Sequence, residues 1–309
     1  MSLQTRVIRL IVRLYRFMAL RPGRTIADQR AALEKFATRF QAQPALTYQR
    51  VFADGVPAEW IVPAARDSVA VVLFLHGGGY NLGSLATHRE LASRLAQACR
   101  CRVLAVAYRL APEHLFPAAL EDAMRAYCWL LAEGVRPEQI ALAGDSAGGG
   151  LALAALVSLR YHGEPLPAAA VCLSPWVDLE LTGHSMIAKA RQDPVLTREV
   201  LQEWARNYLG GKGPRTPLAS PLYADLSGLP PLLIQVGSEE VLHDDAVRLA
   251  ERAQAAGVPV ELEVSAEMMH GWHFFAGKLP EAQRAIARLA AFIRMRCREN
   301  DMPASAQRA

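Results

Sequence analysis

The residues best suited to chemistry begin with a serine set among small residues. Gly144-Asp145-Ser146-Ala147-Gly148 follows the apolar run Ile140–Ala143 and precedes a helical pattern. A sharp strand-to-helix turn exposes the hydroxyl of such a serine, and the turn forms only with small neighbours. The alternative is a phosphate-binding loop, but the segment lacks the G-x-G-x-x-G order and the lysine of such loops. Ser146 is therefore predicted to be a nucleophile.

A second glycine-rich segment fits the same chemistry. His76-Gly77-Gly78-Gly79-Tyr80 directly follows the apolar run Val69–Leu75. Acyl transfer creates a negatively charged oxygen, which backbone N–H groups stabilise when no Cβ blocks their approach. The predicted donors of this oxyanion hole are Gly78, Gly79 and Ala147, and Gly77 could replace either glycine.

A serine hydroxyl needs a histidine to take its proton and a carboxylate to orient that histidine. In proteins with this serine turn, the chain order is serine, acid, histidine. Of the eight histidines, His270 and His273 follow the apolar run Val258–Val264. The loop after the preceding apolar run offers four acids: Glu239, Glu240, Asp244 and Asp245.

The elements that must position these residues alternate between apolar runs and helical patterns. Asp54-Gly55 between two strand-like runs predicts a hairpin. Most later runs lack polar alternation, which is typical of strands buried on both faces. We predict an α/β fold with a mostly parallel, doubly wound sheet of about eight strands. The strands are expected at Leu46–Phe52, Ala58–Val62, Val69–Leu75, Val103–Ala107, Ile140–Ala143, Ala169–Leu173, Leu232–Val236 and Val258–Val264, and helices at Arg89–Ala98, Pro117–Leu131, Leu151–Tyr161, Thr197–Leu209, Asp245–Ala255 and Pro280–Arg296.

Composition narrows the classes of function. The chain has 309 residues, 52% of them apolar, and a net charge of +4, which gives little support for nucleic-acid binding. Its five cysteines are scattered, and Cys99 and Cys101 are too close for a zinc site, so we expect reduced thiols and no metal. The sequence has no apolar run of 18 residues and no signal-peptide core, so a cytoplasmic protein without stable membrane insertion is expected.

Taken together, these motifs resemble the hormone-sensitive lipase family of bacterial esterases. The matching segments are His76–Gly79, Tyr108–Ala119, Gly144–Gly149, Ser174–Leu179, Val236–Asp245 and His270–Trp272. The resemblance implies a carboxylesterase for short or medium acyl chains that uses no cofactor. It implies His270 as the base. We expect His76 to be structural and His273 to pack beside Phe274 and Phe275. It also implies Glu240 as the acid, because Glu240-Val241-Leu242-His243-Asp244 fits the family's pattern.

Some assignments keep alternatives. Most of the family has aspartate at the acid position, so Asp244 is the rival of Glu240, with a helix cap as its other role. Glu239 is expected to point to solvent. Tyr80 and Trp176 either line the acyl pocket or pack in the core. The same catalytic groups could serve a lactonase or an amide deacetylase, and a ligand-binding protein without catalysis is a further alternative.

Two segments interrupt the alternation of strands and helices: residues 1–43 and about 179–226. The resemblance implies that they form a cap within a single domain of residues 1–309. Arg6, Arg9, Arg13 and Arg16 recur at helical spacing beside an apolar face. This pattern fits a cap helix, an interfacial membrane helix or a partner-binding helix. The expected partner is a small ester, and the sequence leaves a homodimer open.

Overall fold

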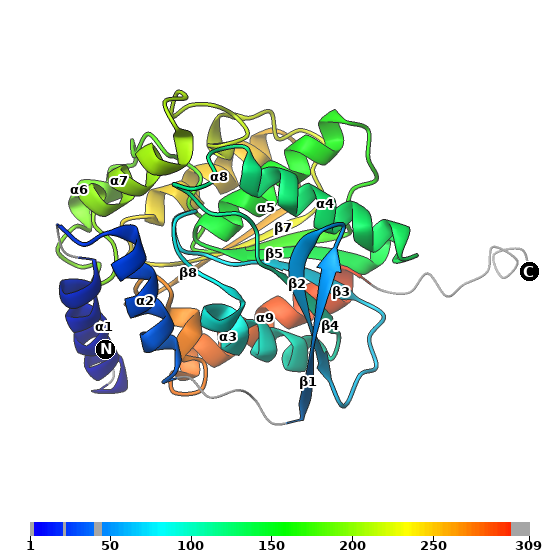
Figure 1. Ribbon diagram of the computed structural model, residues 1–309, viewed down its shortest axis with the longest axis horizontal. Coiled ribbons are helices and arrows are strands. Elements are labelled where there is room, and N and C mark those ends of the chain that lie inside the picture. The colour runs from blue at the N-terminus through cyan, green and yellow to red at the C-terminus, as the bar shows by residue number, and fades with distance from the viewer. Residues whose placement is uncertain (1–2, 21–22, 40–44, 298–309) are drawn as a thin grey trace, which may run out of the picture.

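The computed structural model describes residues 3–20, 23–39 and 45–297, which form an eight-stranded sheet in the order β1-β2-β4-β3-β5-β6-β7-β8 (Figure 1). β2 pairs antiparallel with β1 and β4, and all other neighbours are parallel. The predicted fold class is confirmed, and each predicted strand lies within two residues of its expected ends. The strands are β1 (Leu46–Ala53), β2 (Val56–Pro63), β3 (Val71–Leu75), β4 (Arg102–Val106), β5 (Ile140–Asp145), β6 (Ala169–Leu173), β7 (Leu232–Gly237) and β8 (Val260–Ser265).

The predicted hairpin joins β1 and β2. Asp54 and Gly55 both have positive φ, at 49° and 80°. Ala53 pairs with Val56 across the turn. Two consecutive residues with positive φ match the twist of the flanking strands, which explains the Asp-Gly pair at this position.

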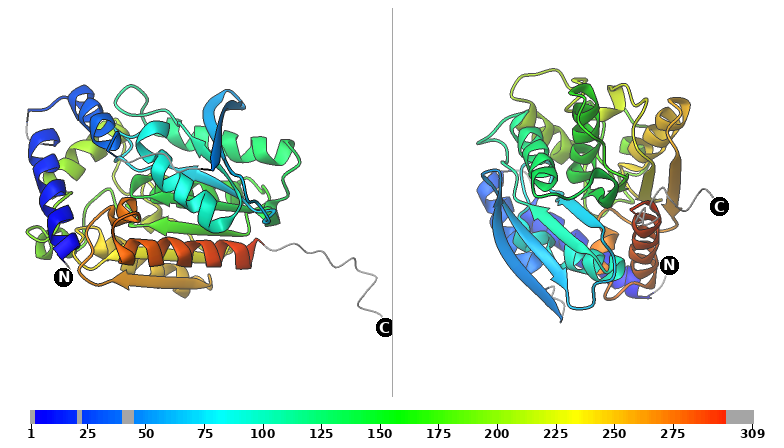
Figure 2. Two further views of the ribbon diagram at one scale, coloured as in Figure 1. Left: turned by 90° about the horizontal axis from the view of Figure 1, so that it is seen from below. Right: turned by 90° about the vertical axis from the view of Figure 1, so that its right-hand side faces the viewer.

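Helices cover both faces of the sheet (Figures 1 and 2). In β3, Leu73 and Leu75 pack toward one face, whereas Val72 and Phe74 pack toward the other. All of β3 is buried, as its continuous apolar run predicts. One face carries α4 (Ala118–Ala132), α5 (Ala147–Tyr161) and α8 (His243–Ala255), and the other carries α3 (Leu85–Cys99) and α9 (Pro280–Arg296).

α5 differs from its predicted start. The sequence predicts a helix from Leu151, but the helix begins at Ala147 and includes Gly148, Gly149 and Gly150. Each glycine disfavours a helix by about 1 kcal/mol, so the three glycines make this first turn look non-helical when only local propensity is considered. Packing requires the small residues, because a Cβ at Gly150 would collide with the carbonyl oxygen of Trp176.

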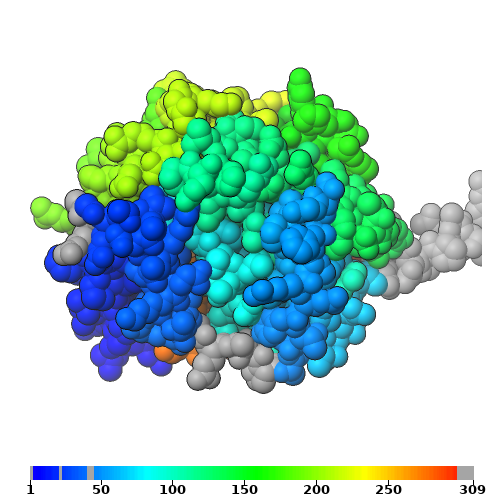
Figure 3. All heavy atoms as spheres, viewed as in Figure 1, coloured from blue at the N-terminus to red at the C-terminus, as the bar shows by residue number. Residues whose placement is uncertain are grey.

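The two segments that interrupt the alternation form helices at one end of the molecule. The N-terminal segment forms α1 (Leu3–Ala19) and α2 (Ile26–Ala37), and the insertion forms α6 (Ser185–Ala188) and α7 (Arg198–Leu209). Figure 1 places them side by side, and Figure 3 shows the N-terminal residues covering this end. The indole N–H of Trp204 donates to Gln29 Oε1 at 3.1 Å, so the two segments are in contact.

The connections between these elements contain three short 3-10 helices: η1 (Pro137–Gln139), η2 (Pro221–Tyr223) and η3 (Trp272–Phe275). All five cysteines are free thiols in this structure. Within the described ranges, none of the helices is long and apolar enough to span a bilayer.

Candidate active site

Ser146 lies at the turn between β5 and α5, with φ 54° and ψ −121°. Residues other than glycine rarely adopt positive φ, and such a conformation costs about 1–3 kcal/mol. The surrounding chain holds it in place: Ser146 N–H donates to Leu173 O at 2.8 Å, and Ser146 O accepts from Trp176 N–H at 2.9 Å. A Cβ at Gly144 would collide with the carbonyl of Gly148, so only glycine fits there.

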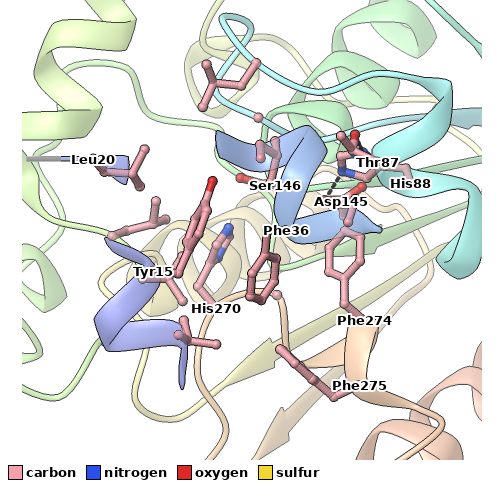
Figure 4. Close-up of a pocket in the computed structure, with 18 of the residues that line it drawn as sticks. Tyr15, Leu20, Phe36, Thr87, His88, Asp145, Ser146, His270, Phe274 and Phe275 are labelled. Atoms are coloured by element: carbon pink, nitrogen blue, oxygen red, sulfur yellow. Dashed lines mark hydrogen bonds and ion pairs between the residues drawn. The ribbon is translucent and has the colours of Figure 1, made fainter. Parts of the chain in front are cut away.

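Ser146 and His270 line the same cavity, which has a volume of about 140 Å³ (Figure 4). Its remaining walls are mostly apolar and come from segments far apart in the sequence. Val12, Tyr15, Leu33 and Phe36 come from α1 and α2, Val195, Leu196 and Trp204 come from the insertion, and Phe274 and Phe275 come from η3. The predicted nucleophile and base are therefore brought together beneath the helices that cover this end of the sheet.

His270 is paired with Glu240. Its Nδ1 lies 2.9 Å from Glu240 Oε2, and the Glu240 side chain is fully buried. The other carboxylate oxygen accepts from Ser174 Oγ at 2.7 Å and from the Gly237 N–H at 2.6 Å. A carboxylate held by three donors has a defined orientation. It therefore fixes the tautomer of His270 with the proton on Nδ1 and leaves Nε2 free to accept a proton.

The surroundings of His270 also change its basicity. Burial lowers the pKa of the imidazole, but the hydrogen bond and charge of Glu240 raise it, as do the charges of Asp193 and Asp145. The net result is a His270 pKa above its ordinary value of 6.5. Together with the hydrogen bond from Nδ1, this makes His270 a stronger acceptor for a hydroxyl proton than an isolated histidine.

The proposed oxyanion donors lie near the cavity. Gly78 lines it directly, and Ala147 N–H belongs to the first turn of α5, where helix N–H groups lack helical acceptors. The N–H of Gly77 donates to Asp145 Oδ1 at 3.0 Å, so that donor is already used. Of the three glycines in this loop, the geometry thus favours Gly78 and Gly79.

The other acids of the β7–α8 loop have separate partners. Glu239 forms an ion pair with Arg9 at 3.1 Å, which corrects the expectation that it points to solvent. Asp244 lies in the first turn of α8 and accepts from Ser185 N–H at 2.9 Å. Asp245 is fully buried and accepts from the backbone N–H of Val177 and Asp178. Glu240 is the member of this group that hydrogen-bonds to His270.

Two other histidines proposed for structural roles are buried. His76 stacks on Tyr108 and hydrogen-bonds through Nδ1 to Gly77 O at 2.7 Å. His273 Nε2 lies 3.1 Å from Gln235 Oε1. Burial lowers the pKa of both imidazoles to about 3, so both are neutral near pH 7. These contacts match packing roles.

Tyr80 and Trp176 are the residues predicted either to line the acyl pocket or to pack in the core. Tyr80 is stacked on Tyr208 with a centroid distance of 3.8 Å, and Trp176 donates from Nε1 to Asp178 O at 3.1 Å. Both are almost fully buried, and neither belongs to the described lining of the cavity that holds Ser146. The geometry supports core packing, and contact with substrate stays a prediction.

Sequence reasoning missed two polar pairs beside the cavity. Asp145 Oδ2 lies 3.4 Å from His88 Nε2, and both residues line the cavity. Asp193 is buried and accepts from Val241 N–H at 3.0 Å, next to Glu240 in the chain. Asp145 lies inside the serine motif, which was a usable signal. Asp193 belongs to the insertion and is far from Val241 in the sequence, so no local pattern predicts their contact.

Metal binding has no candidate in the part of the chain that the structure describes, since no three His, Cys, Asp or Glu side chains gather as a metal site requires. The cavity instead offers the Ser146 hydroxyl, the oriented imidazole of His270 and backbone N–H groups among mostly apolar walls. This combination suits nucleophilic attack on a carbonyl carbon.

Known proteins share both the fold and the motifs. The family model described as "alpha/beta hydrolase fold" matches residues 72–274. An acetyl-hydrolase from Streptomyces hygroscopicus is 54% identical over 77% of this chain and 79% of its own length. An esterase from Acinetobacter venetianus is 37% identical over 85% of this chain and 87% of its own. The crystal structure of an esterase from the bacterial hormone-sensitive lipase family has a TM-score of 0.93 and 50% identity, covering 96% of this chain and 99% of that one.

Proposed function

Because the chain belongs to the bacterial hormone-sensitive lipase family of esterases on the α/β-hydrolase fold, we propose that it hydrolyses short- to medium-chain acyl esters through an acyl-enzyme on Ser146. The observation that carries this assignment is the buried Glu240–His270 pair in the loops beside Ser146, with Ser146 and His270 lining one cavity. The same pair and cavity support the assignment of the catalytic residues.

The proposed reaction has two steps. His270 Nε2 takes the proton of the Ser146 hydroxyl as its oxygen attacks the ester carbonyl, and the N–H groups of Gly78, Gly79 and Ala147 stabilise the oxyanion. His270 then gives the proton to the departing alcohol. In the second step, His270 removes a proton from water as the water oxygen attacks the acyl carbon; the bond from that carbon to Ser146 Oγ then breaks, His270 returns the proton to Oγ, and the carboxylic acid leaves.

The size of the cavity supports short acyl groups. At about 140 Å³ it is smaller than the roughly 300–1,000 Å³ typical of sites for larger ligands. The acetyl-hydrolase of Streptomyces hygroscopicus is named for the acetyl group, which is consistent with this size. We also propose that the N-terminal segment (about 1–43) and the insertion (about 179–226) act together as a cap over the site. We further propose a cytoplasmic location, with which the free thiols are consistent.

The direct test is covalent labelling with a fluorophosphonate, followed by mapping of the modified peptide. We expect the label on Ser146, and Ser146→Ala should abolish both labelling and hydrolysis, because removal of a triad nucleophile costs about a million-fold in kcat. Ser158→Ala, which changes a buried serine of the same helix, is the matched control. Labelling elsewhere, or more than about one per cent residual turnover in folded Ser146→Ala, contradicts the proposal. Matched ester, lactone and amide substrates then define the preferred bond.

A further inference from the structure

α1 presents an apolar face to solvent. Seven of the fourteen exposed large apolar side chains in the described residues belong to this one helix. They are exposed by between 44% and 77% and define what we call the outer face of α1: Leu3, Val7, Leu10, Ile11, Leu14, Phe17 and Met18. At about 100° per residue they fall within an arc of roughly 120°.

The fold itself does not use this face. The opposite side of α1 already packs on the protein through Ile8 and Val12, which are each 5% exposed. Val12 and Tyr15 also line the cavity that holds Ser146. One apolar face is enough to attach a surface helix to its core, so the outer face is in excess of what packing requires.

The charges on α1 have a single sign. The helix contains four arginines and no acid. Arg9 and Arg16 turn inward, since Arg9 pairs with Glu239 and Arg16 donates to Asp193 O. Arg6 and Arg13 are exposed, and neither forms an ion pair with any residue of the ranges 3–20, 23–39 and 45–297.

A basic groove extends the same surface. It has a volume of about 600 Å³ and lies between α1, α2 and η3, with Val7, Ile11 and Phe36 among its apolar walls. Its two cationic lining residues, Arg39 and Lys278, are both exposed. Apolar and cationic side chains therefore occur together on α1 and along the groove. Neither α1 nor the groove lining contains an acidic residue.

We propose that the outer face of α1 binds the surface of an anionic lipid bilayer, with the helix lying in the interface and not crossing it. An apolar arc flanked by arginines buries its side chains among acyl chains while the guanidinium groups contact lipid phosphates. The outer face holds no polar side chain that would orient a protein partner. A symmetric contact with a second copy would bring the same arginines together without a helix acid to pair with them.

The test is co-sedimentation of the full-length protein with vesicles of phosphatidylglycerol or phosphatidylcholine. We expect at least about tenfold stronger binding to the anionic vesicles, weakened by about 0.5 M NaCl. The double variant Leu10→Ser/Leu14→Ser should lose about tenfold or more of this binding. Arg6→Gln/Arg13→Gln should reduce binding to the anionic vesicles and leave the weak binding to phosphatidylcholine unchanged.

Two controls make the result specific. Ile187→Ser removes an apolar side chain that is 70% exposed on α6, and it should leave vesicle binding unchanged. Leu10 and Leu14 line neither the cavity nor the groove, so the double variant should hydrolyse a soluble short-chain ester at the normal rate. Equal vesicle binding by the wild type and the Leu10/Leu14 variant overturns the proposal. So does a wild-type dimer that ignores vesicles and is dissociated by the same substitutions.

Discussion

Glu240 and His270 form a buried pair in which the carboxylate is restrained on both of its oxygens. Oε2 lies 2.9 Å from His270 Nδ1, while Oε1 accepts from Ser174 Oγ and the Gly237 N–H at 2.7 and 2.6 Å. A glutamate side chain has one more rotatable bond than aspartate, and these two additional donors offset the freedom that the extra bond brings. The longer acid can therefore hold the imidazole as firmly as a shorter one.

Glu240→Gln should leave the protein folded and lower kcat by about ten-thousand-fold, because an amide can stabilise the wrong imidazole tautomer. Glu240→Asp should be milder, since the charge remains and only the reach is lost. Steady-state kinetics and thermal melting of the purified variants measure both effects.

The matched control is Asp244→Asn, which lies four residues after Glu240 in the first turn of α8. Asp244 does not cap α8 but accepts from the backbone N–H of Ser185, so this variant should lose at most roughly 1 kcal/mol of stability, through a weaker hydrogen bond, and keep most of its turnover. If Asp244→Asn abolishes turnover while Glu240→Gln does not, the assignment of the acid is reversed.

The pH profile should report the environment of His270. The imidazole acts as a base only when it is neutral, so kcat/KM should fall as pH falls through the His270 pKa. Burial lowers this pKa, but Glu240 and nearby acids raise it above 6.5, so the inflection is expected above pH 6.5. In Glu240→Gln the imidazole loses the neighbouring charge that raises its pKa, so the inflection of the residual activity should move to lower pH. An inflection at the same pH in the variant would show that the profile does not report the Glu240–His270 pair.

Phe36 should limit the length of the acyl chain. Phe36 and Phe275 line both the cavity of about 140 Å³ and the groove of about 600 Å³. Phe36→Ala should connect the two spaces, raising kcat/KM for longer acyl esters relative to acetyl esters by about tenfold. The acyl-length profile on a matched series of esters measures this. Phe52→Ala, a change at an exposed phenylalanine of β1, should leave the profile unchanged.

Asp245 should make stability depend on pH. Burial, followed by the charge of Asp178, raises its pKa from 3.8 to about 8. The folded state therefore binds this proton more tightly than the unfolded state, and its contribution to stability declines as pH rises from about 4 to about 8. The side chain of Asp245→Asn does not titrate, so this variant should not share the decline. Its free energy of unfolding should therefore rise relative to that of the wild type as pH increases across this range. Urea unfolding at several pH values measures the difference, and a constant difference would contradict the expectation.

Much of the fold and part of the site follow from local patterns. Continuous apolar runs such as Val71–Leu75 predict the positions of strands, because a sheet covered by helices on both faces has no polar side. Family motifs identify the chain as a carboxylic ester hydrolase, and the comparisons confirm this class. The catalytic assignments to Ser146, Glu240 and His270 stay predictions, supported by the geometry of the site.

The remaining features depend on contacts between distant residues. The pairing of Arg9 with Glu239 joins residues 230 positions apart, and no local pattern encodes it. Asp193 reaches Val241 in the same way. The early start of α5 was missed for a different reason, because the packing that requires Gly148–Gly150 overrides their low helix propensity.

The contact between Arg16 and the carbonyl of Asp193 spans 177 positions of the chain, and this has a consequence for synthesis. A ribosome adds about 5–20 residues per second, so roughly ten to thirty-five seconds pass between the emergence of these two partners. During that interval α1 has neither the insertion nor η3 to cover its inner face. The apolar residues of α1 are therefore unshielded for most of translation, which makes this segment the part of the nascent chain most exposed to non-native association.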